Sequence, residues 1–235
     1  MKWIAHRSGP TVYPEQTIAS ARHALENGAD IVEIDVRFTA DKRIAVSHDK
    51  NLSRVFGEDL ECDAITAQRF RALRHVSDAS FGSHLLEDYL ACGVAPLLIH
   101  IKENAVIAEL LRIMDEYGGA DRAIMGVADV ASAAQVRAHD PAIRILSFAP
   151  KAEDTAAFAA VGVDYIRLWE KWLTEENVRL VKESGAALWV MSGGAEPGHP
   201  VGEPSVEGLY RIAQWEPDGI LVNDVPFARA ALEEE

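Results

Sequence analysis

Two carboxylates stand two positions apart, at Glu33 and Asp35, inside the apolar run 31–35. If this run is a strand, both side chains lie on one face of it, because successive side chains of a strand point to opposite faces. Burying two carboxylates costs roughly several kcal/mol unless a cation compensates their charge. Two interpretations have equal weight: the pair binds a divalent metal ion, which favours oxygen ligands, or it forms an ion pair with Arg7 or Arg37.

A later apolar run, 97–102, ends in two basic residues that share one strand face, His100 and Lys102. A single histidine on a strand is more often a satisfied core residue than a metal ligand. Beside the two carboxylates, the metal-ligand interpretation of His100 gains weight. Lys102 either meets a phosphate group or pairs with one of the carboxylates.

Two histidines stand at the ends of other apolar runs. His6 ends the run 3–6, and His48 ends the run 44–48. The stretch before 44–48 is shorter than the dozen or so residues of a parallel crossover, so we expect this run to return antiparallel as a hairpin arm. His48 can then hang over the end of the carboxylate strand. Each histidine alone is more simply explained as a surface residue, but a pair facing a metal site suits general acid–base chemistry.

Eight short apolar runs alternate with helical patterns along the chain. This alternation predicts an α/β fold, a single (β/α)8 TIM barrel with a parallel sheet. Active sites of such barrels lie at the carboxyl ends of the strands, where the residues described above are found. The predicted strands are 3–6, 31–35, 97–101, 123–126, 144–147, 164–167, 188–191 and 219–222.

The stretches between the strands begin with Thr, Asn, Asp or Ser and several end before a glycine, as helices do. An insertion, roughly within 37–95, follows the second strand and combines the hairpin, a loop segment and a helix. Residues 1–235 are expected to form one domain, because no low-complexity linker divides them. The predicted helices are 17–27, 64–74, 87–92, 105–117, 130–138, 154–160, 174–184 and 205–214.

The composition restricts the class of protein. The chain has 235 residues, of which 49% are hydrophobic, and a formal net charge of −14. The apolar fraction excludes a disordered chain, and the acidic balance argues against nucleic acid or a polybasic membrane surface as a partner. No signal peptide and no membrane-spanning run of roughly 18 apolar residues is visible, so stable membrane insertion is not expected. Cys62 and Cys92 are interpreted as free thiols, and a cytoplasmic location is expected. The oligomeric state is left open.

Four segments, in order, are AHRSGPTVYPEQT, NGADIVEIDVRFTADKRIAVSHDKNLSR, LLIHIK and WEPDGILVNDVP. They resemble the glycerophosphodiester phosphodiesterase family, whose pattern is His-Arg-Gly, Pro-Glu-Asn-Thr, Gly-Ala-Asp with Glu-x-Asp, His-Asp, Glu-x-Lys and Gly-x-x-x-x-Asp-x-Pro. The order and spacing extend over nearly the whole chain. The resemblance implies a (β/α)8 barrel with an insertion after the second strand. It also implies metal-dependent hydrolysis of a small-molecule glycerophosphodiester to glycerol 3-phosphate and an alcohol.

The resemblance further implies roles for the matching residues. His6 and His48 would be the general acid–base pair, and Glu33 and Asp35 would hold a divalent metal ion such as Mg, Ca or Mn. Which histidine is the acid and which is the base is left open.

The phosphate, by the same resemblance, would be bound by Arg7 and its charge neutralised by Lys102. Glu15 would be a supporting residue near the loop that follows the first strand. Two departures from the family pattern are mild: Ser8 replaces a glycine, and Gln16 replaces an asparagine.

A larger departure concerns the third metal ligand. The family has the Glu of Glu-x-Lys, and this chain has His100 at that position. An imidazole leaves the site one negative charge short and favours softer metals such as Mn, Zn, Co or Ni over Ca. Glu103 is a poor substitute, because alternation points it away from the barrel interior. We therefore predict a metal site of Glu33, Asp35 and His100.

Two residues of later strands are further candidates for substrate binding, Arg167 and Trp189. Arg167 stands at a strand end, where it could read a second anionic group, whereas packing is the simpler explanation for Trp189. The stretch 193–204 is expected to be a long loop at the active mouth. Three alternatives stay open: a lysophospholipase D-type activity, another phosphodiesterase activity on this fold, and a barrel that binds a phosphate ligand without catalysis.

Overall fold

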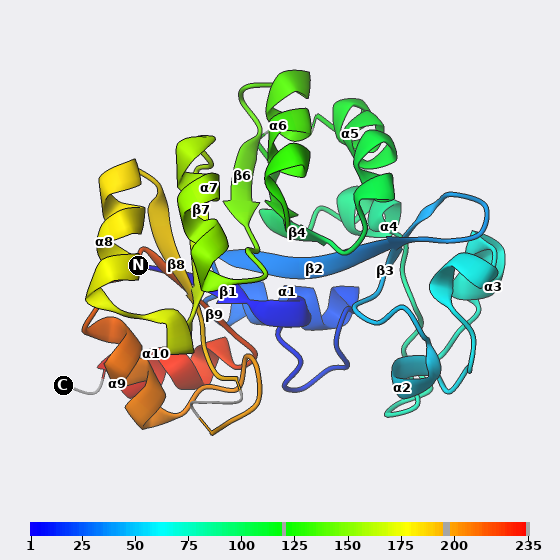
Figure 1. Cartoon of the computed structure of the whole chain (residues 1–235). Helices are drawn as coiled ribbons and strands as arrows, with labels where there is room; N and C mark the ends of the chain where they lie inside the picture. Colours follow the sequence, from blue (N-terminus) through cyan, green and yellow to red (C-terminus); the bar gives the residue numbers. More distant parts are fainter. Residues whose placement is uncertain (119–120, 195–197, 234–235) are drawn as a thin grey trace.

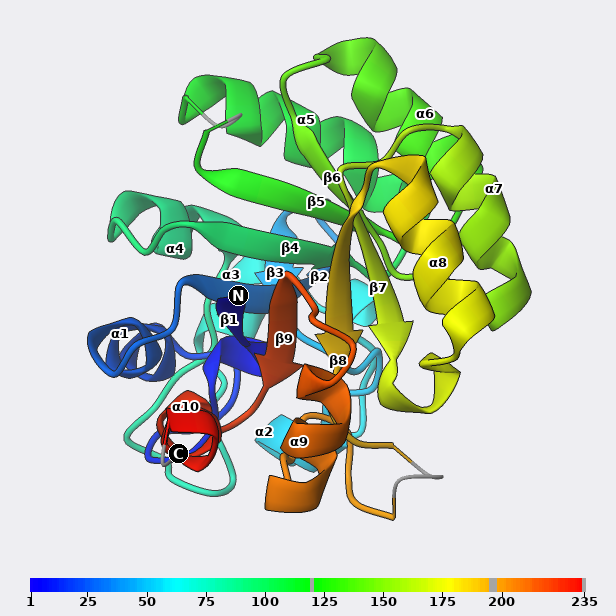
Figure 2. The same cartoon turned by 90° about the vertical axis from the view of Figure 1, so that its left-hand side faces the viewer.

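The computed structural model describes residues 1–118, 121–194 and 198–233, and in these residues nine strands form one sheet. All strands except β3 run parallel, and the sheet closes because β1 pairs with both β9 and β2 (Figure 2). This closed barrel confirms the predicted fold. The barrel strands are β1 (Lys2–Ala5), β2 (Ile31–Phe38), β4 (Leu97–Ile101), β5 (Ala123–Val127), β6 (Arg144–Ser147), β7 (Tyr165–Trp169), β8 (Ala187–Met191) and β9 (Gly219–Val222).

Helices surround the barrel on its outside (Figure 1). Several begin at a polar residue whose side chain accepts a hydrogen bond from the backbone N–H three residues further on, namely Thr17, Asp129, Thr174 and Ser205. These caps satisfy N–H groups that have no partner inside the helix. The helices are α1 (Ile18–Glu26), α4 (Leu86–Ala91), α5 (Ile107–Glu116), α6 (Val130–His139), α7 (Thr155–Ala160), α8 (Glu175–Ser184), α9 (Val206–Ala213) and α10 (Val225–Glu233).

The last helix, α10, is missing from the predicted set. Its first turn is held by Asp224, whose side-chain oxygen accepts a hydrogen bond from the N–H of Phe227 (2.9 Å). Val225 and Ala228 are its buried side chains. Its apolar pattern is short, and only its position beside β1 and α9 makes burial of this face possible.

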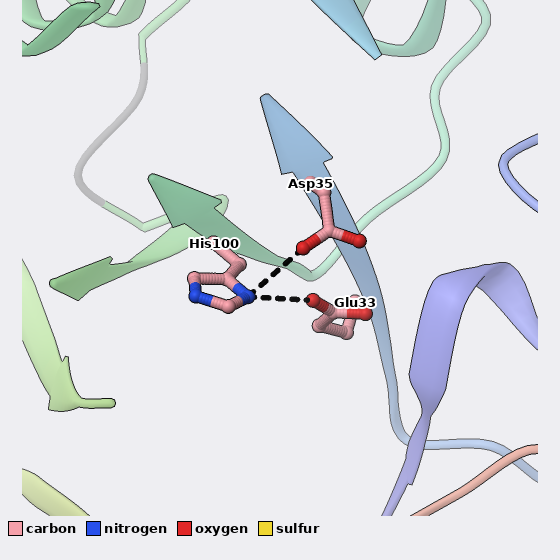
Figure 3. A group of neighbouring side chains, drawn as sticks. All are labelled: Glu33, Asp35 and His100. Atoms are coloured by element: carbon pink, nitrogen blue, oxygen red, sulfur yellow. Dashed lines mark ion pairs between the residues drawn. The ribbon is translucent and has the colours of Figure 1, made fainter. Parts of the chain in front are cut away.

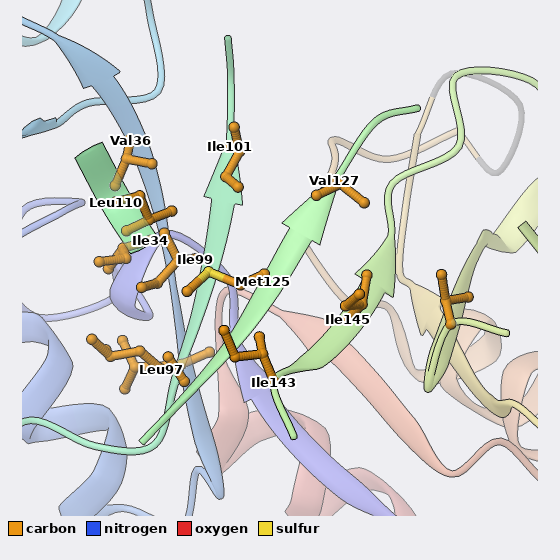
Figure 4. Packing of buried hydrophobic residues seen from close by; sticks show 14 of the residues in the cluster. Ile34, Val36, Leu97, Ile99, Ile101, Leu110, Met125, Val127, Ile143 and Ile145 are labelled. Carbon is orange, nitrogen blue, oxygen red and sulfur yellow. The ribbon is translucent and has the colours of Figure 1, made fainter. Parts of the chain in front are cut away.

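Strand alternation sorts the side chains of the barrel into two sets. Ile34, Val36, Ile99 and Ile101 point outward and pack under the helices (Figure 4). The residues that alternate with them on β2 and β4 face the barrel interior, and these include the carboxylates and His100. Beneath this polar layer a separate apolar cluster fills the barrel, including Ile4, Leu98, Ile124, Leu146, Trp189 and Leu221.

The insertion after β2 contains β3 (Ile44–Val46), α2 (Ser53–Phe56), a 3₁₀ turn (Cys62–Ala64) and α3 (Ala67–Arg71). As predicted, β3 pairs antiparallel with β2. The insertion has its own apolar cluster, centred on Phe56, Phe70 and Leu85. The helix predicted over 64–74 is confirmed only as the shorter α3, because Arg74 forms an isolated bridge with Gly82. In Figure 1 the α2 and α3 helices lie beside one end of the barrel.

No helix of the described residues is long and apolar enough to span a membrane. The loop expected over 193–204 is described except for 195–197, which lie outside the described residues. Its described part returns to the barrel, since the N–H of Gly202 donates to the carbonyl of Ser192 (2.8 Å) and the N–H of Asn223 donates to the carbonyl of Gly202 (2.5 Å).

Candidate active site

A cavity of about 310 Å³ opens at the carboxyl ends of the barrel strands. It brings together most of the side chains for which the sequence predicted a role. The strand ends meet here because all barrel strands run in the same direction. The cavity is lined by His6, Arg7, Glu33, His48, His100, Lys102, Phe148, Arg167, Trp169, Met191 and Val201.

Glu33, Asp35 and His100 point toward one another (Figure 3), and Glu33 and His100 line the cavity. The Nδ1 atom of His100 lies 2.9 Å from Oδ1 of Asp35 and 3.6 Å from Oε1 of Glu33. One donor atom from each residue lies within 4.8 Å of the others. Oδ1 of Asp35 is buried and makes no hydrogen bond of acceptable geometry with the described residues. Two buried carboxylates, one of them with an oxygen that lacks a hydrogen bond, and an imidazole fit a divalent cation.

The second oxygen of each carboxylate in this cluster accepts a hydrogen bond from a residue of the loop after β1. Oδ2 of Asp35 accepts a hydrogen bond from Nε2 of Gln16 (2.6 Å), and Oε2 of Glu33 accepts one from the N–H of Arg7 (2.7 Å). Arg7 and Gln16 both have positive φ angles, 48° and 59°. Strained backbone of this kind is found where a site fixes its geometry. These donors leave one oxygen of each carboxylate facing His100.

Neither Arg7 nor Arg37 pairs with the two carboxylates through its guanidinium, so the ion-pair interpretation is wrong for these arginines. The guanidinium of Arg37 donates to the carbonyl of His48 (3.0 and 3.1 Å). The positive charge beside Asp35 comes instead from Lys102, whose Nζ lies 3.5 Å from Oδ1, and Nδ1 of His100 lies 2.9 Å from the same oxygen. Burial opposes ionisation of Asp35, but contact with His100 and the charges of Lys102 and His48 keep its pKa well below its usual range.

His6 is buried and linked to a residue at the far end of the chain. Its Nδ1 lies 2.7 Å from Oδ1 of Asn223, the residue that follows β9. An amide oxygen only accepts hydrogen bonds, so this contact requires a proton on Nδ1 and leaves Nε2 as the nitrogen that can exchange a proton. Gly202 keeps the space free, because a Cβ there would lie 2.4 Å from Oδ1 of Asn223. Sequence reasoning missed Asn223, and its place directly after the last strand is the signal that could have found it.

His48 hangs over the cavity from the loop after β3, as the hairpin interpretation predicted. Its Nδ1 lies 2.7 Å from Oδ1 of Asp49. Burial lowers the pKa of His48, and Lys102 and Arg7 lower it further, although Asp35 and Asp49 act in the opposite direction. A lowered pKa keeps the His48 imidazole neutral at neutral pH, which is the form that accepts a proton.

Glu15 connects Arg7 with Arg54. It lies 3.5 Å from the guanidinium of Arg7 and accepts two hydrogen bonds from Arg54 (2.6 and 3.0 Å). Arg54 in turn donates to Asp49, the partner of His48. Burial raises the pKa of Glu15, but the two arginines outweigh it and lower the pKa overall. The expected supporting position of Glu15 near Arg7 is therefore present.

Arg167 lies across the cavity, on β7, and is 3% exposed. Its Nε and Nη1 atoms are buried and have no hydrogen-bond partner among the described residues. Aromatic rings surround it instead: its Cζ lies 4.2 Å from the ring centre of Trp169 and 5.2 Å from that of Phe148. Burial lowers the pKa of Arg167 to about 9, so the guanidinium is still charged at neutral pH.

The structure corrects the expected position of Trp189. Its side chain is 1% exposed and packs inside the barrel, below the cavity. The space is available because Gly219, beside it on β9, has no side chain: a Cβ there would lie 3.0 Å from the indole. The tryptophan that lines the cavity is Trp169. Trp189 supports the packing of the barrel and does not reach the cavity.

Phe148 is a second residue whose place only the structure reveals. Its ring stacks on His100, with centroids 3.8 Å apart and an angle of 14° between the planes. Gly126 makes this stack possible, since a Cβ at that position would lie 2.4 Å from the Phe148 ring. Phe148 contacts Arg167 as well, so this ring connects the candidate metal site with the unpaired guanidinium.

The fold and the site together define a (β/α)8 barrel with a candidate divalent-metal site and two histidines at its mouth. The sequence matches the Glycerophosphoryl diester phosphodiesterase family over residues 6–225, and the chain belongs to that family. The resemblance noted from the motifs is thereby confirmed.

Relatives and solved structures agree with this assignment. A glycerophosphodiester phosphodiesterase from Bacillus altitudinis is 49% identical over 53 residues, which are 23% of this chain and 22% of that protein. The glycerophosphodiester phosphodiesterase structure from Agrobacterium tumefaciens has a TM-score of 0.80 at 21% identity and covers 98% of this chain and 99% of its own. An Oleispira antarctica phosphodiesterase, solved with the product sn-glycerol-3-phosphate, has a TM-score of 0.83 at 16% identity, with 100% and 97% covered.

The match to curated relatives is partial in length. The aligned part is less than two thirds of the length of each of them, for example 56% of a Bacillus subtilis protein that is 31% identical over 137 residues. At identities of 21% and below, the solved structures establish the shared fold.

Proposed function

We propose that this protein hydrolyses glycerophosphodiesters to glycerol 3-phosphate and an alcohol, with a divalent metal ion and the pair His6 and His48. The observation that carries the proposal is the convergence of a carboxylate–imidazole cluster, two histidines and three cations on one cavity. Such a set matches the needs of phosphodiester hydrolysis: charge stabilisation on the phosphoryl oxygens, a base and an acid. The relative solved with sn-glycerol-3-phosphate supports the choice of product.

Glu33, Asp35 and His100 would hold the metal ion. When bound, the ion supplies stabilisation of the negative charge that develops on the phosphoryl oxygens. In the structure Lys102 supplies positive charge beside Asp35. With a cation in the cluster, Lys102 is released from this pairing and becomes available to the phosphate.

His48 is proposed as the general base. Its neutral Nε2 takes a proton from the nucleophile, which is either water or the 2-hydroxyl of the glycerol. The Asp49 carboxylate accepts a hydrogen bond from Nδ1, which orients the ring and stabilises the imidazolium that forms. His6 is proposed as the general acid in its imidazolium form, which carries a proton on each ring nitrogen. Asn223 accepts a hydrogen bond from Nδ1, and Nε2 gives its proton to the leaving alkoxide.

Arg7 is proposed to bind the phosphate. Its left-handed backbone turns the residue so that the N–H supports Glu33 while the side chain lines the cavity. Glu15 holds the guanidinium in place and fixes its orientation. A bound phosphodiester would then meet Arg7 and Lys102 without the cost of ordering flexible side chains.

The test is release of glycerol 3-phosphate by metal-stripped protein supplied with Mg, Ca, Mn, Zn, Co or Ni, on a panel of glycerophosphodiesters. His48→Ala is the negative control, and calorimetric titration of each metal provides a readout that does not depend on turnover. We expect release that requires a metal and disappears in the control. Metal binding without release from any diester would favour a binding barrel, and a cyclic phosphate as the sole product would indicate attack by the glycerol 2-hydroxyl without hydrolysis.

A further inference from the structure

Arg167 is a buried cation without a counter-charge in the described part of the chain. Among the described residues it forms no ion pair with a carboxylate, and two of its three guanidinium nitrogens are buried without a hydrogen bond. Leaving donors of a charged group unpaired in a low-dielectric site is costly, and buried arginines are normally paired. The side chain also lines the cavity. An anion that enters the cavity would satisfy these donors.

The place of Arg167 separates it from the groups that would hold the scissile phosphate. In the closed strand order β7 stands across the barrel from β2, which provides Glu33 and Asp35. Phe148 lies between the two sides, because its ring stacks on His100 and also contacts the Arg167 guanidinium. A phosphodiester held by the metal cluster and Arg7 would therefore direct one of its two ester arms toward Arg167.

Room for that arm exists next to Arg167. A groove of about 290 Å³ adjoins the cavity and shares Trp169 and Val201 with it. Its other lining residues include Lys171 and Trp172. The groove therefore presents apolar rings together with a second cation at its border, which suits a polyol ring or chain with a negative charge.

The aromatic rings around Arg167 also indicate which alcohol is disfavoured. A cage of aromatic rings can bind a quaternary ammonium group such as that of choline. Here the rings of Phe148, Trp169 and Trp172 already surround the Arg167 guanidinium, at 5.2, 4.2 and 5.8 Å from Cζ. A second cation at this place would meet a like charge in a buried site.

The charges of the cavity point in the same direction. Glu33 and Asp35 balance a divalent ion, and Glu15 balances Arg7. Lys102 and Arg167 are then left, and a phosphodiester brings a single negative charge. One more anionic group on the substrate would complete the balance.

We propose that the Arg167 side of the cavity selects glycerophosphodiesters whose alcohol carries a second anionic group, with a phosphorylated polyol as the chemical class. This inference rests on the proposed function for the reaction itself. Arg167 acts here as a specificity residue that contacts the alcohol, and the proton transfers of the cleavage belong to the two histidines.

The test compares three diesters that share the glycerol 3-phosphate product: glycerophosphoinositol, glycerophosphoinositol 4-phosphate and glycerophosphocholine. We expect kcat/KM for the phosphorylated inositol to exceed that for plain inositol by roughly 30-fold, with choline the poorest, since a desolvated charge pair is worth about this factor or more. In Arg167→Met the ratio between the two inositols should fall to near one. Arg167→Lys should recover part of the ratio.

Each contrary outcome has a distinct meaning. Equal loss on all three diesters in Arg167→Met would show that Arg167 contacts the scissile phosphate, and absence of a preference in the wild type would overturn the inference directly. If no diester is cleaved, the proposed function has failed. Calorimetric binding of the two inositol diesters to His48→Asn then still tests the inference, because Arg167 should make the phosphorylated one bind more tightly.

A folding control completes the design. Arg167→Met removes a buried charge without a partner and keeps a long apolar side chain, so its Tm should equal or exceed that of the wild type. A lower Tm together with lost selectivity would assign Arg167 a structural role and overturn the inference.

Discussion

The two sides of the cavity differ in whether their charged side chains have polar partners. On the side of β1, β2 and β4, the carboxylates contact polar or charged neighbours: the backbone N–H of Arg7 donates to Glu33, Gln16 and His100 contact Asp35, and two arginines contact Glu15. On the side of β7 and β8, Arg167 has aromatic rings around it and no counter-ion among the described residues.

This difference separates two tasks. A paired network costs little to keep rigid, and it holds the reacting groups in one geometry before a substrate arrives. An unpaired cation is costly in the free protein and gains its partner only from a ligand, which makes it a suitable device for selection. Phe148, in contact with both His100 and Arg167, is the ring where the two sides meet.

The largest effect is expected from removing a carboxylate of the paired side. Asp35→Asn should reduce glycerol 3-phosphate release by about 1,000-fold or more, because metal-ion stabilisation is worth several kcal/mol. Calorimetry should show weaker metal binding in the same variant. The matched control is Glu103→Gln, a carboxylate that binds the N–H of Phe38 outside the cavity and should retain the metal. Unchanged metal affinity in Asp35→Asn would remove Asp35 from the site.

The next effect concerns His48 and its pH dependence. His48→Ala should lower kcat by about 100- to 10,000-fold, as loss of a general base does. In the wild type, kcat/KM should fall only when the pH drops below the lowered pKa of His48, since a base with a lowered pKa stays neutral to more acidic pH.

Asp49→Asn sharpens this test because the Asp49 carboxylate raises the pKa of His48. Its removal should lower that pKa further and move the acidic limb of the pH profile to lower pH. A shift to higher pH would contradict the assignment of His48 as the base.

Asn223 tests the positioning of His6. Asn223→Ala should lower kcat by about 10- to 100-fold, the usual cost of losing a group that orients a reactive side chain. Asn223→Asp keeps an acceptor at Nδ1, so it should recover most of the lost activity. Equal loss of kcat in both variants would contradict a positioning role for the hydrogen bond to Nδ1.

His100 tests the choice of metal. His100→Glu restores the carboxylate of the family pattern, and calorimetry should show the ratio of Mn to Ca affinity falling by about tenfold, as an oxygen ligand replaces nitrogen. A control at His84, a half-buried histidine of the insertion, should leave this ratio unchanged. Equal affinity of the wild type for Ca and Mn would count against His100 as a ligand.

The smallest effect on the chemistry is expected at the border between the two sides. Gly126→Ala places a Cβ against the Phe148 ring and should destabilise the fold by about 1–3 kcal/mol, measured by urea unfolding. Phe148→Leu in the same chain should relieve part of this loss, because the smaller side chain gives way. Additive effects of the two substitutions would show that the close contact between Gly126 and Phe148 is absent.

Patterns in the sequence were enough to predict the barrel and the inward-facing polar groups of β2 and β4. Alternation along 31–35 and 97–102 placed Glu33, Asp35 and His100 on inward faces, and this depends only on local strand geometry. The same reasoning gave the antiparallel arm that carries His48. These features are local, so a pattern of neighbouring residues was sufficient to predict them.

Contacts between residues far apart in the chain depend on how the barrel closes. His6 meets Asn223 across 217 positions because barrel closure brings β1 beside β9. Trp189 enters the interior because Gly219 on the next strand leaves space. The absence of a partner for Arg167 likewise depends on every element that surrounds the cavity, and a linear pattern does not contain that information.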